Sequence, residues 1–361
     1  MTFNPMQPYN NLPPLPPPVD VETKAILKKA ISAGRTLAEL KGLGGVIPNQ
    51  SMLVNTLVLQ EARASSEIEN IITTNDALFR ALTANNPNVD PATKEVLRYR
   101  EALWTGYNSL TKNRRLNTDL FVKTVQIIKK DRKSIRNVPG TVIANRITGA
   151  VIYTPPAGEP LIRKKLKELE TFIHTADDID PLVKLALIHY QFEAVHPFFD
   201  GNGRTGRIII IYYLLHKGLL DLPVLYLSKY IIDRKSEYYR LLRQVTERSA
   251  WEPWILYMLD AVETTAALTR QQILDIRALM DDTVTFAKNK LPTRVYSKEL
   301  IELVFRQPYT KGQLLVDAGI AERKTAADYL QELEKIGILK RKKVGRENLY
   351  LNEKLYKLLS K

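Results

Sequence analysis

The sequence predicts a mainly α-helical protein with one short β-hairpin and a smaller C-terminal domain that mixes helices and strands. Three observations lead to this fold class. Apolar residues recur at helical spacing over most of the chain. Two runs rich in β-branched residues flank Thr148-Gly149, as in a hairpin. The pattern then changes beyond Leu291-Pro292-Thr293, which indicates a domain boundary. With 361 residues, the chain is long enough for two or three domains.

The N-terminal region is expected to be helical after a proline-rich start. Pro5–Pro18 favours polyproline II, either as a disordered tail or as a strap packed along the domain. A first helix is expected from Asp20 to about Leu40, and a second begins at Pro48-Asn49. The second helix leads to Ser65 and Glu69, which are four residues apart and therefore share one helix face.

Further helices are expected along the middle of the chain. Asp90-Pro91 and Asp180-Pro181 each place an N-cap residue before a proline at the first helical position. Leu120–Ile128 carries an apolar helical face, and the basic run Lys129–Arg136 follows it. That run is interpreted either as a solvated face or as a contact for a partner. Thr141–Ile147 and Ala150–Thr154 are the two expected hairpin strands.

Composition limits the class of protein without choosing a function. The chain has 45% hydrophobic and 25% charged residues, which is ordinary for a soluble globular protein. Its net charge of +14 suits anionic partners such as nucleotides, acidic protein surfaces or nucleic acid. No apolar run has membrane-spanning length and the start lacks the pattern of a signal peptide, so we expect a cytoplasmic protein without a membrane partner. The absence of cysteine excludes disulfides and thiolate metal sites.

The most informative stretch is His196–Arg207, read as His-Pro-Phe-Phe-Asp-Gly-Asn-Gly-Arg-Thr-Gly-Arg between two apolar helical runs. A glycine-rich turn that opens a helix directs backbone N–H groups and the positive end of the helix dipole at one point. Gly201, Asn202, Gly203 and Arg204 would form this anion site.

Other side chains of the same stretch suit phosphate chemistry. Arg204 and Arg207 add positive charge for phosphate oxygens. Asp200 offers oxygen ligands for Mg²⁺ that is held mainly by substrate phosphates. His196 could take a proton from an attacking hydroxyl, while Phe198 would seat the loop. Together they describe transfer of a phosphate-containing group from a nucleotide to a hydroxyl.

This stretch resembles the signature of the Fic family, His-x-Phe-x-Asp/Glu-Gly-Asn-Gly-Arg-x-x-Arg, at every defined position. The resemblance implies a Fic helical bundle that transfers AMP from ATP to Ser, Thr or Tyr side chains of proteins. It implies that His196 is the base, that Asp200 binds Mg²⁺ and that Arg207 contacts the γ-phosphate. The predicted ATP-binding residues are Gly201, Asn202, Gly203, Arg204, Thr205, Gly206, Arg207 and, for the adenine, Tyr230.

A second resemblance concerns the segment at about 64–72. Ser65, Glu69 and Asn70 match the inhibitory motif of Fic proteins, Ser/Thr-x-x-x-Glu-Gly/Asn. The resemblance implies that Glu69 pairs with Arg207 and removes the partner of the γ-phosphate. The alternative is an exposed pair on one helix, worth a few tenths of a kcal/mol. The hairpin, at about 141–154, resembles the Fic flap and would hold the target protein by adding a strand.

The C-terminal segment has the order of a winged-helix domain, with a helix-turn-helix followed by two strands. Arg323, Lys324 and Thr325 would begin the recognition helix, and Lys340–Lys343 with Arg346 would form the wing. From Leu291 onward, fifteen Lys/Arg minus nine Asp/Glu leave a net charge of +6. This charge permits contact with DNA, but winged helices also dock proteins.

The predicted domains are an N-terminal helical region (1–110), a Fic core (111–288) and a winged helix-turn-helix domain (291–361). The favoured function is a protein adenylyltransferase restrained by Glu69. An enzyme of the same fold that removes AMP is one alternative, and a DNA-binding regulator that senses nucleotide is another. A homodimer that stabilises the inhibitory helix is a further hypothesis, for which no segment argues.

Overall fold

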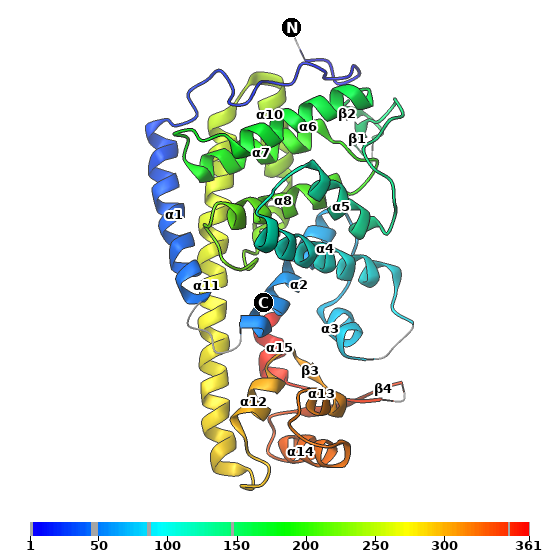
Figure 1. Cartoon of the computed structure of the whole chain (residues 1–361), viewed down its shortest axis with the longest axis vertical. Helices are drawn as coiled ribbons and strands as arrows, with labels where there is room; N and C mark the ends of the chain where they lie inside the picture. The colour runs from blue at the N-terminus through cyan, green and yellow to red at the C-terminus, as the bar shows by residue number, and fades with distance from the viewer. Residues whose placement is uncertain (1–2, 45–49, 85–87, 146–147, 346, 361) are drawn as a thin grey trace.

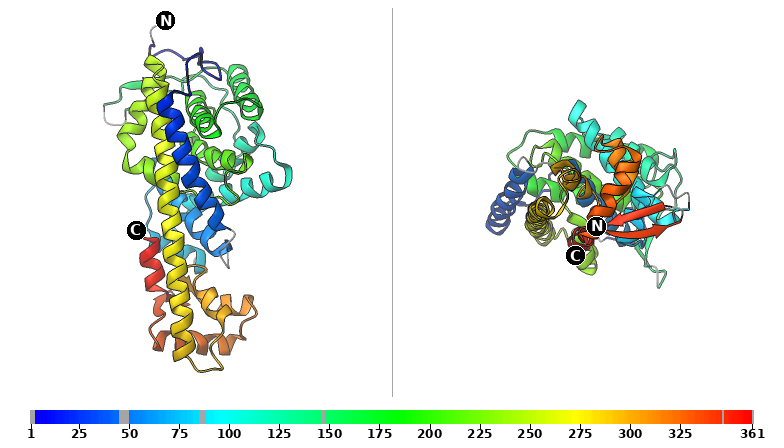
Figure 2. Two further views of the ribbon diagram at one scale, coloured as in Figure 1. Left: turned by 90° about the vertical axis from the view of Figure 1, so that its left-hand side faces the viewer. Right: turned by 90° about the horizontal axis from the view of Figure 1, so that it is seen from below.

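The structure is a computed structural model that describes residues 3–44, 50–84, 88–145, 148–345 and 347–360, with only the backbone for residues 50–55. Over these ranges it contains fifteen helices and five short strands. The longest element, α11 (Trp251–Lys290), has 40 residues and extends about 60 Å at 1.5 Å per residue. It runs along one side of the molecule, with α1 (Lys24–Gly44) beside its first half (Figures 1 and 2).

Five helices form the bundle that carries the signature stretch: α4 (Pro91–Asn113), α5 (Thr118–Lys129), α6 (Glu159–His174), α7 (Pro181–Val195) and α8 (Asn202–His216). The predicted helix starts are confirmed, because Asp90 accepts a hydrogen bond from Thr93 N at 2.8 Å and Asp180 caps α7 in the same way. Almost every residue of α7 and α8 is buried. An uninterrupted apolar sequence therefore places this helix pair at the centre of the bundle.

Helix α2 (Gln50–Ile68) crosses from the C-terminal domain to the bundle (Figure 1). Its expected start at Pro48-Asn49 lies outside the described residues. The helix packs against α4 and α9 (Leu227–Asp233). The buried carboxylate of Glu61 joins the three helices, accepting hydrogen bonds from Tyr99 Oη at 3.0 Å and from Ser228 N at 2.9 Å. Burial raises the pKa of Glu61, and these hydrogen bonds oppose that effect.

The hairpin is shorter than the β-branched runs suggested. Strand β1 (Ile143–Ala144) pairs antiparallel with β2 (Val151–Tyr153), and part of its tip lies outside the described residues. The proline-rich start is a packed strap rather than a loose tail. Tyr9 N donates to Thr154 O at 2.9 Å, and Phe3 stacks on Tyr153 with 6.1 Å between ring centroids.

Helix α11 ends at Lys290, immediately before the predicted boundary, and the C-terminal elements follow. They are α12 (Lys298–Val304), β3 (Tyr309–Thr310), α13 (Gly312–Asp317), α14 (Arg323–Lys335), β4 (Lys340–Val344), β5 (Glu347–Leu351) and α15 (Glu353–Leu359). The order of helices and hairpin is the expected one, whereas β3 and α15 were not predicted. A two-residue strand has no readable alternation, yet β3 joins the edge of β5 to give the sheet order β3-β5-β4.

The C-terminal elements pack against the N-terminal helices through specific polar contacts. Tyr309 Oη donates to Asp76 on α3 (Asn75–Thr83) at 2.6 Å. Gln60 Nε2, on α2, donates to the carbonyl oxygen of Leu359 at the end of α15. The C-terminal elements therefore contact the N-terminal region through α2 and α3. In the described part of the chain, no helix combines the length and the apolar character that crossing a membrane requires.

Candidate active site

The signature stretch forms the turn between α7 and α8. His196 ends α7 in the left-handed conformation with φ of 47°, and Gly201 precedes α8 with φ of 84°. The side chain of Asn202 braces the turn from within, since its Oδ1 accepts from Phe198 N at 2.8 Å and its Nδ2 donates to Phe198 O at 2.7 Å. Phe198 is buried against Phe192, as expected for a residue that seats the loop.

Arg136 holds the backbone around His196 in place. Its guanidinium donates to the carbonyl oxygens of His196 at 2.8 Å and Val195 at 3.3 Å, and it also reaches Pro156 beyond the hairpin. The side chain is 2% exposed, so the interpretation of the whole basic run as a solvated or partner-binding face is wrong at this position. A buried arginine satisfies several carbonyls at once because its donors form a planar fork.

The imidazole of His196 is suited to act as a base. Burial, followed by the nearby charge of Arg136, lowers the pKa of His196 to about 4, so the ring is neutral at neutral pH. The ring also has a hydrogen bond with the backbone of Glu193, which acts against this lowering. A neutral imidazole can accept a proton from an incoming hydroxyl.

Asp200 and Arg204 belong to a charged network on the outer side of the turn. Lys129 Nζ lies 2.6 Å from Asp200 Oδ2 and 3.0 Å from Glu95 Oε1, while the buried Arg204 lies 2.5 Å from the same Glu95 oxygen. Burial would raise the pKa of Asp200, but Lys129 and Arg204 outweigh it and lower the pKa. Asp200 remains an exposed, ionised carboxylate (63% exposed side chain).

The donor set at this turn fits a substrate-held Mg²⁺ better than a metal cage built from the protein. Among the described residues, no three His, Asp or Glu side chains gather as a metal site. A single exposed carboxylate such as Asp200 matches the way Mg²⁺ is bound when phosphates and waters supply its other ligands. Asp200 would hold the ion, whose charge would stabilise the phosphate oxygens.

Glu69 lies against the glycine turn and pairs with Arg207. Arg207 Nη2 lies 2.9 Å from Glu69 Oε1 and 2.8 Å from the carbonyl oxygen of Ser65, and its Nε donates to Ser65 Oγ at 2.8 Å. Burial favours a raised pKa for Glu69, but the charge and hydrogen bonds of Arg207 outweigh it, so its pKa is lowered. Glu69 contacts Arg207 across the bundle rather than a neighbour on its own helix.

Glu69 also lies directly against a glycine of the predicted phosphate site. A Cβ atom built on Gly203 would lie 2.4 Å from Glu69 Oε1 and 3.0 Å from Arg207 Nη1. The carboxylate therefore rests directly on the glycine that the signature assigns to phosphate. Asn70 follows in the left-handed conformation with φ of 61°, which ends the turn of α2 there.

One cavity of about 510 Å³ unites several of these residues with the hairpin. Of the predicted site residues, it is lined by Glu69, Asn70, His196, Gly203 and Arg207. Its other walls come from Val142, Ile143, Ala144, Ile152 and Tyr153 at the hairpin, from Lys235, Tyr238 and Tyr239 on α10 (Lys235–Arg248), from Glu193 and from Phe3.

The structure places other predicted ATP-binding residues away from this cavity. Tyr230, predicted to contact the adenine, lies on α9, donates to Asp260 Oδ2 at 2.5 Å, packs beneath Arg234 and does not line this cavity. The aromatic wall comes instead from α10, because α9 ends at Asp233 before the chain reaches the cavity. Thr205 is buried, and Gly206 lies against Glu193, where a Cβ atom would come within 2.2 Å of Glu193 Oε1.

Sequence reasoning missed Glu193. It precedes His196 by three residues at the end of α7, and this spacing on a helix was the available signal. Burial raises the pKa of Glu193 to about 7, with Glu69 adding to the effect and Arg207 opposing it. Besides His196, the cavity thus contains a carboxyl group whose pKa lies near 7.

Three sequence families match successive parts of the chain. Residues 27–108 match the Fic/DOC family N-terminal region, residues 114–214 match the Fic/DOC family, and residues 279–355 match the C-terminal domain of protein adenylyltransferase SoFic-like. The crystal structure of a Fic family protein from Desulfovibrio desulfuricans G20 superposes with a TM-score of 0.55 at 18% identity, over 91% of this chain and 96% of that one. The fold is therefore that of the Fic proteins.

Curated relatives agree with this class. Protein adenylyltransferase fic-1 of Caenorhabditis elegans is 28% identical over 139 residues, which are 37% of this chain and 25% of that protein. Protein adenylyltransferase Fic of Drosophila grimshawi is 31% identical over 93 residues, which are 26% of this chain and 18% of that protein. The aligned regions span about a quarter or less of these relatives. This chain belongs to the Fic/DOC family, and its C-terminal part is of the SoFic-like kind.

Proposed function

We propose that the protein transfers AMP from ATP to a hydroxyl of a protein side chain. The observation that carries the proposal is the shared cavity, which is lined by the neutral imidazole of His196, the signature glycine Gly203 and the buried Arg207 together with residues of the hairpin. Names of the curated relatives, which are protein adenylyltransferases, support the same activity.

In the proposed reaction, His196 takes the proton of the target hydroxyl as that oxygen attacks the α-phosphorus. A new bond forms between the hydroxyl oxygen and the α-phosphorus, and the bond to the bridging oxygen of the β-phosphate breaks. Pyrophosphate leaves with the electron pair of that bond. Backbone N–H groups at the start of α8 stabilise the phosphate charge, and Arg207 holds the γ-phosphate once Glu69 has released it.

The target protein is proposed to add a strand to the hairpin, whose residues Ile143 and Ala144 line the cavity that contains His196. Main-chain hydrogen bonds would place the hydroxyl without demanding a particular sequence. Incubation with labelled ATP and Mg²⁺, followed by mass spectrometry for an added AMP, tests the activity. His196→Ala must abolish the label, and equal labelling in wild type and His196→Ala would refute the proposed role.

Removal of AMP is a second candidate, which the position of Glu69 favours. Its side chain is 29% exposed and lines the cavity that also contains His196, where the carboxylate could orient a water molecule. Incubation of an AMP-modified protein with wild type and Glu69→Gly separates the two directions. If the protein removes AMP, Glu69→Gly should lose that activity. If it adds AMP, Glu69→Gly should be the more active of the two.

The C-terminal region is proposed to be a winged helix that contacts DNA. Arg323 and Lys324 are exposed at the start of α14, and Lys340, Arg341 and Lys343 are exposed on β4. Gel-shift titrations at two salt concentrations test this proposal, since phosphate contacts weaken steeply with salt. If DNA causes no gel shift even at low salt, the proposal of DNA binding fails, and docking of a protein becomes the proposed role of this domain.

A further inference from the structure

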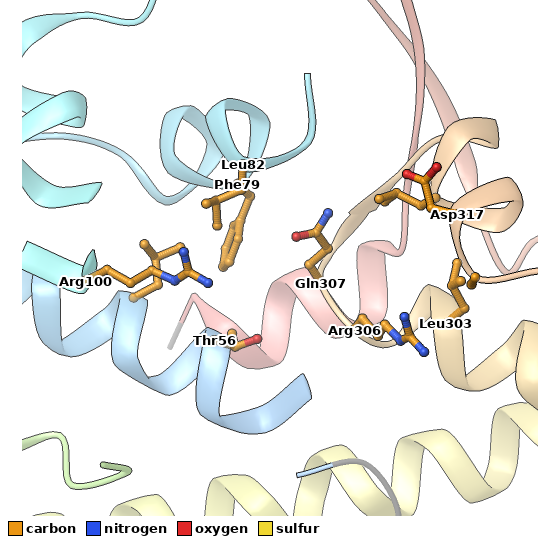
Figure 3. Close-up of a pocket in the computed structure, with 11 residues that line it drawn as sticks. Thr56, Phe79, Leu82, Arg100, Leu303, Arg306, Gln307 and Asp317 are labelled. Carbon is orange, nitrogen blue, oxygen red and sulfur yellow. The ribbon is translucent and has the colours of Figure 1, made fainter. Parts of the chain in front are cut away.

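A second cavity, of about 390 Å³, lies between the C-terminal domain and the N-terminal helices. Its volume is within the range of small-molecule sites, roughly 300–1,000 Å³. One side consists of Thr56, Leu59, Phe79, Leu82 and Arg100, and the other of Leu303, Arg306, Gln307, Leu314, Asp317 and Ala318 (Figure 3). The signature stretch contributes no residue to these walls.

Hydrogen bonds connect the two regions whose residues line this cavity. Gln307 Nε2 donates to Thr83 Oγ1 at 3.1 Å, and Tyr309 Oη donates to Asp76 at 2.6 Å. Gln60, one residue beyond Leu59 on α2, contacts the end of α15. The cavity is therefore bounded by ordered contacts between the two regions.

The lining combines an apolar surface with two guanidinium groups and one carboxylate. Figure 3 shows Phe79, Leu82 and Arg100 extending from the N-terminal helices toward the side that carries Gln307. Burial lowers the pKa of Arg100 from its ordinary value, as expected for a guanidinium in a confined site. Arginine binds oxyanions through two parallel hydrogen bonds, and Leu, Phe and Arg side chains together suit an amphiphilic anion.

We propose that this cavity binds a small molecule with an apolar body and one oxyanion group, such as a carboxylate, phosphate or sulfonate. The apolar body would lie on Leu59, Phe79 and Leu82, and the oxyanion would face Arg100.

The location of the cavity suggests how such a ligand acts. Thr56 and Leu59 lie on α2, the same helix that leads to Ser65 and Glu69 at Arg207. Ten residues, from Leu59 to Glu69, correspond to about 15 Å along a helix. A ligand that joins α2 to the C-terminal domain would hold the helix in place and strengthen the contact of Glu69 with Arg207. This regulatory part rests on the proposed function, whereas the binding part does not.

Two fluorescent probes of matched shape test the binding in the full chain. The first, 8-anilino-1-naphthalenesulfonate, has one sulfonate, and the second, N-phenyl-1-naphthylamine, lacks it. We expect the sulfonate probe to bind about tenfold more tightly, as one charge-assisted contact implies. Arg100→Gln should remove that preference, and Arg100→Lys, which keeps the charge but loses the paired donors, should reduce it if Arg100→Gln does not fold.

A cavity-filling substitution separates this site from the active-site cavity. Ala318→Phe places a ring in the cavity and should abolish the high-affinity binding of both probes. Ala327→Phe is the matched control, because Ala327 is exposed on α14 of the same domain and lies outside the cavity. Equal probe binding by these two variants, or equal affinity of the two probes for wild type, would overturn the proposed site.

The regulatory part has its own readout. The sulfonate probe should lower AMP transfer severalfold in wild type and leave Glu69→Gly and Ala318→Phe unchanged. An unchanged rate in wild type despite probe binding would overturn the coupling through α2. If no variant transfers AMP, the proposed function fails, and the fluorescence titrations still decide whether the cavity is a binding site.

Discussion

Replacing Glu69 by glycine is the perturbation that tests the central arrangement most directly. Arg207 is 1% exposed, and its single carboxylate contact among the described residues is the 2.9 Å pair with Glu69. Without Glu69, the guanidinium keeps its bonds to Ser65 and becomes available to a γ-phosphate. A charge-assisted hydrogen bond contributes about 1.5–3 kcal/mol. Since 1.4 kcal/mol corresponds to a factor of ten, AMP transfer should rise roughly 10- to 100-fold.

The same substitution should destabilise the protein in the absence of nucleotide. Removing one partner of a buried ion pair costs about 3–5 kcal/mol when the remaining charge has no other contact. Ser65 retains two hydrogen bonds to Arg207 and Glu69 is partly exposed, so a loss on the order of 2 kcal/mol is expected. ATP should restore more stability to Glu69→Gly than to wild type, because the triphosphate replaces the missing charge.

The assay compares the initial rate of labelling by ATP with the denaturant midpoint, both with and without ATP. Glu67→Gly is the matched control, since Glu67 lies on α2 two residues before Glu69 and its side chain forms a surface pair with Arg63 at 3.7 Å. It introduces the same glycine near the end of α2 without touching Arg207. Equal rates for wild type, Glu67→Gly and Glu69→Gly would refute the reasoning. Equal activation by both variants would show that fraying of α2, rather than release of Arg207, controls transfer.

Three further predictions follow from groups near His196. The pKa of His196 is about 4, so the chemical shifts of its ring in an NMR titration should change only below pH 5. A titration midpoint near pH 6.5, the value of a free imidazole, would contradict its burial. In the folded protein the pKa of Glu193 is raised to about 7, so its contribution to stability is fully present below the pKa of the unfolded chain and is lost as the pH rises through 7. Glu193→Gln cannot ionise, so its free energy of unfolding should increase relative to that of wild type as the pH rises from 5 to 8. A difference in stability that does not change with pH would contradict this. Arg136→Met frees the backbone of His196 and should lower kcat for transfer roughly 100-fold with little change in ATP affinity, with Arg136→Lys as the comparison; an unchanged kcat in both variants would remove its positioning role.

Local signals in the sequence were sufficient to predict where several helices begin and where the glycine-rich turn lies. Asp90 and Asp180 cap their helices where a proline follows, and Gly201 has the left-handed conformation that the glycine-rich turn requires. The hairpin around Thr148-Gly149 and the end of α11 before Leu291 also follow from local residue preferences. These features depend on a few neighbouring residues, whose conformational preferences act whatever the rest of the chain does.

Contacts between distant segments were decided only by the tertiary structure. Arg136 looked like part of a basic surface run, yet the fold buries it beneath His196, 60 residues later. Tyr230 lies only five residues from Lys235, yet the end of α9 turns it toward Asp260 and away from the cavity. Glu193 owes its raised pKa to burial that no sequence pattern reports.

The sequence by itself predicted the signature residues of the candidate site and where several helices begin, because capping, turn formation and the signature are local properties. Only the tertiary structure decided that Glu69 rests on Gly203 beside Arg207, that Arg136 supports His196, and that α2 links the C-terminal domain to the cavity. The physical reason is that charge pairing and burial depend on distances across the bundle. Those distances arise from the packing of helices that are far apart in the sequence.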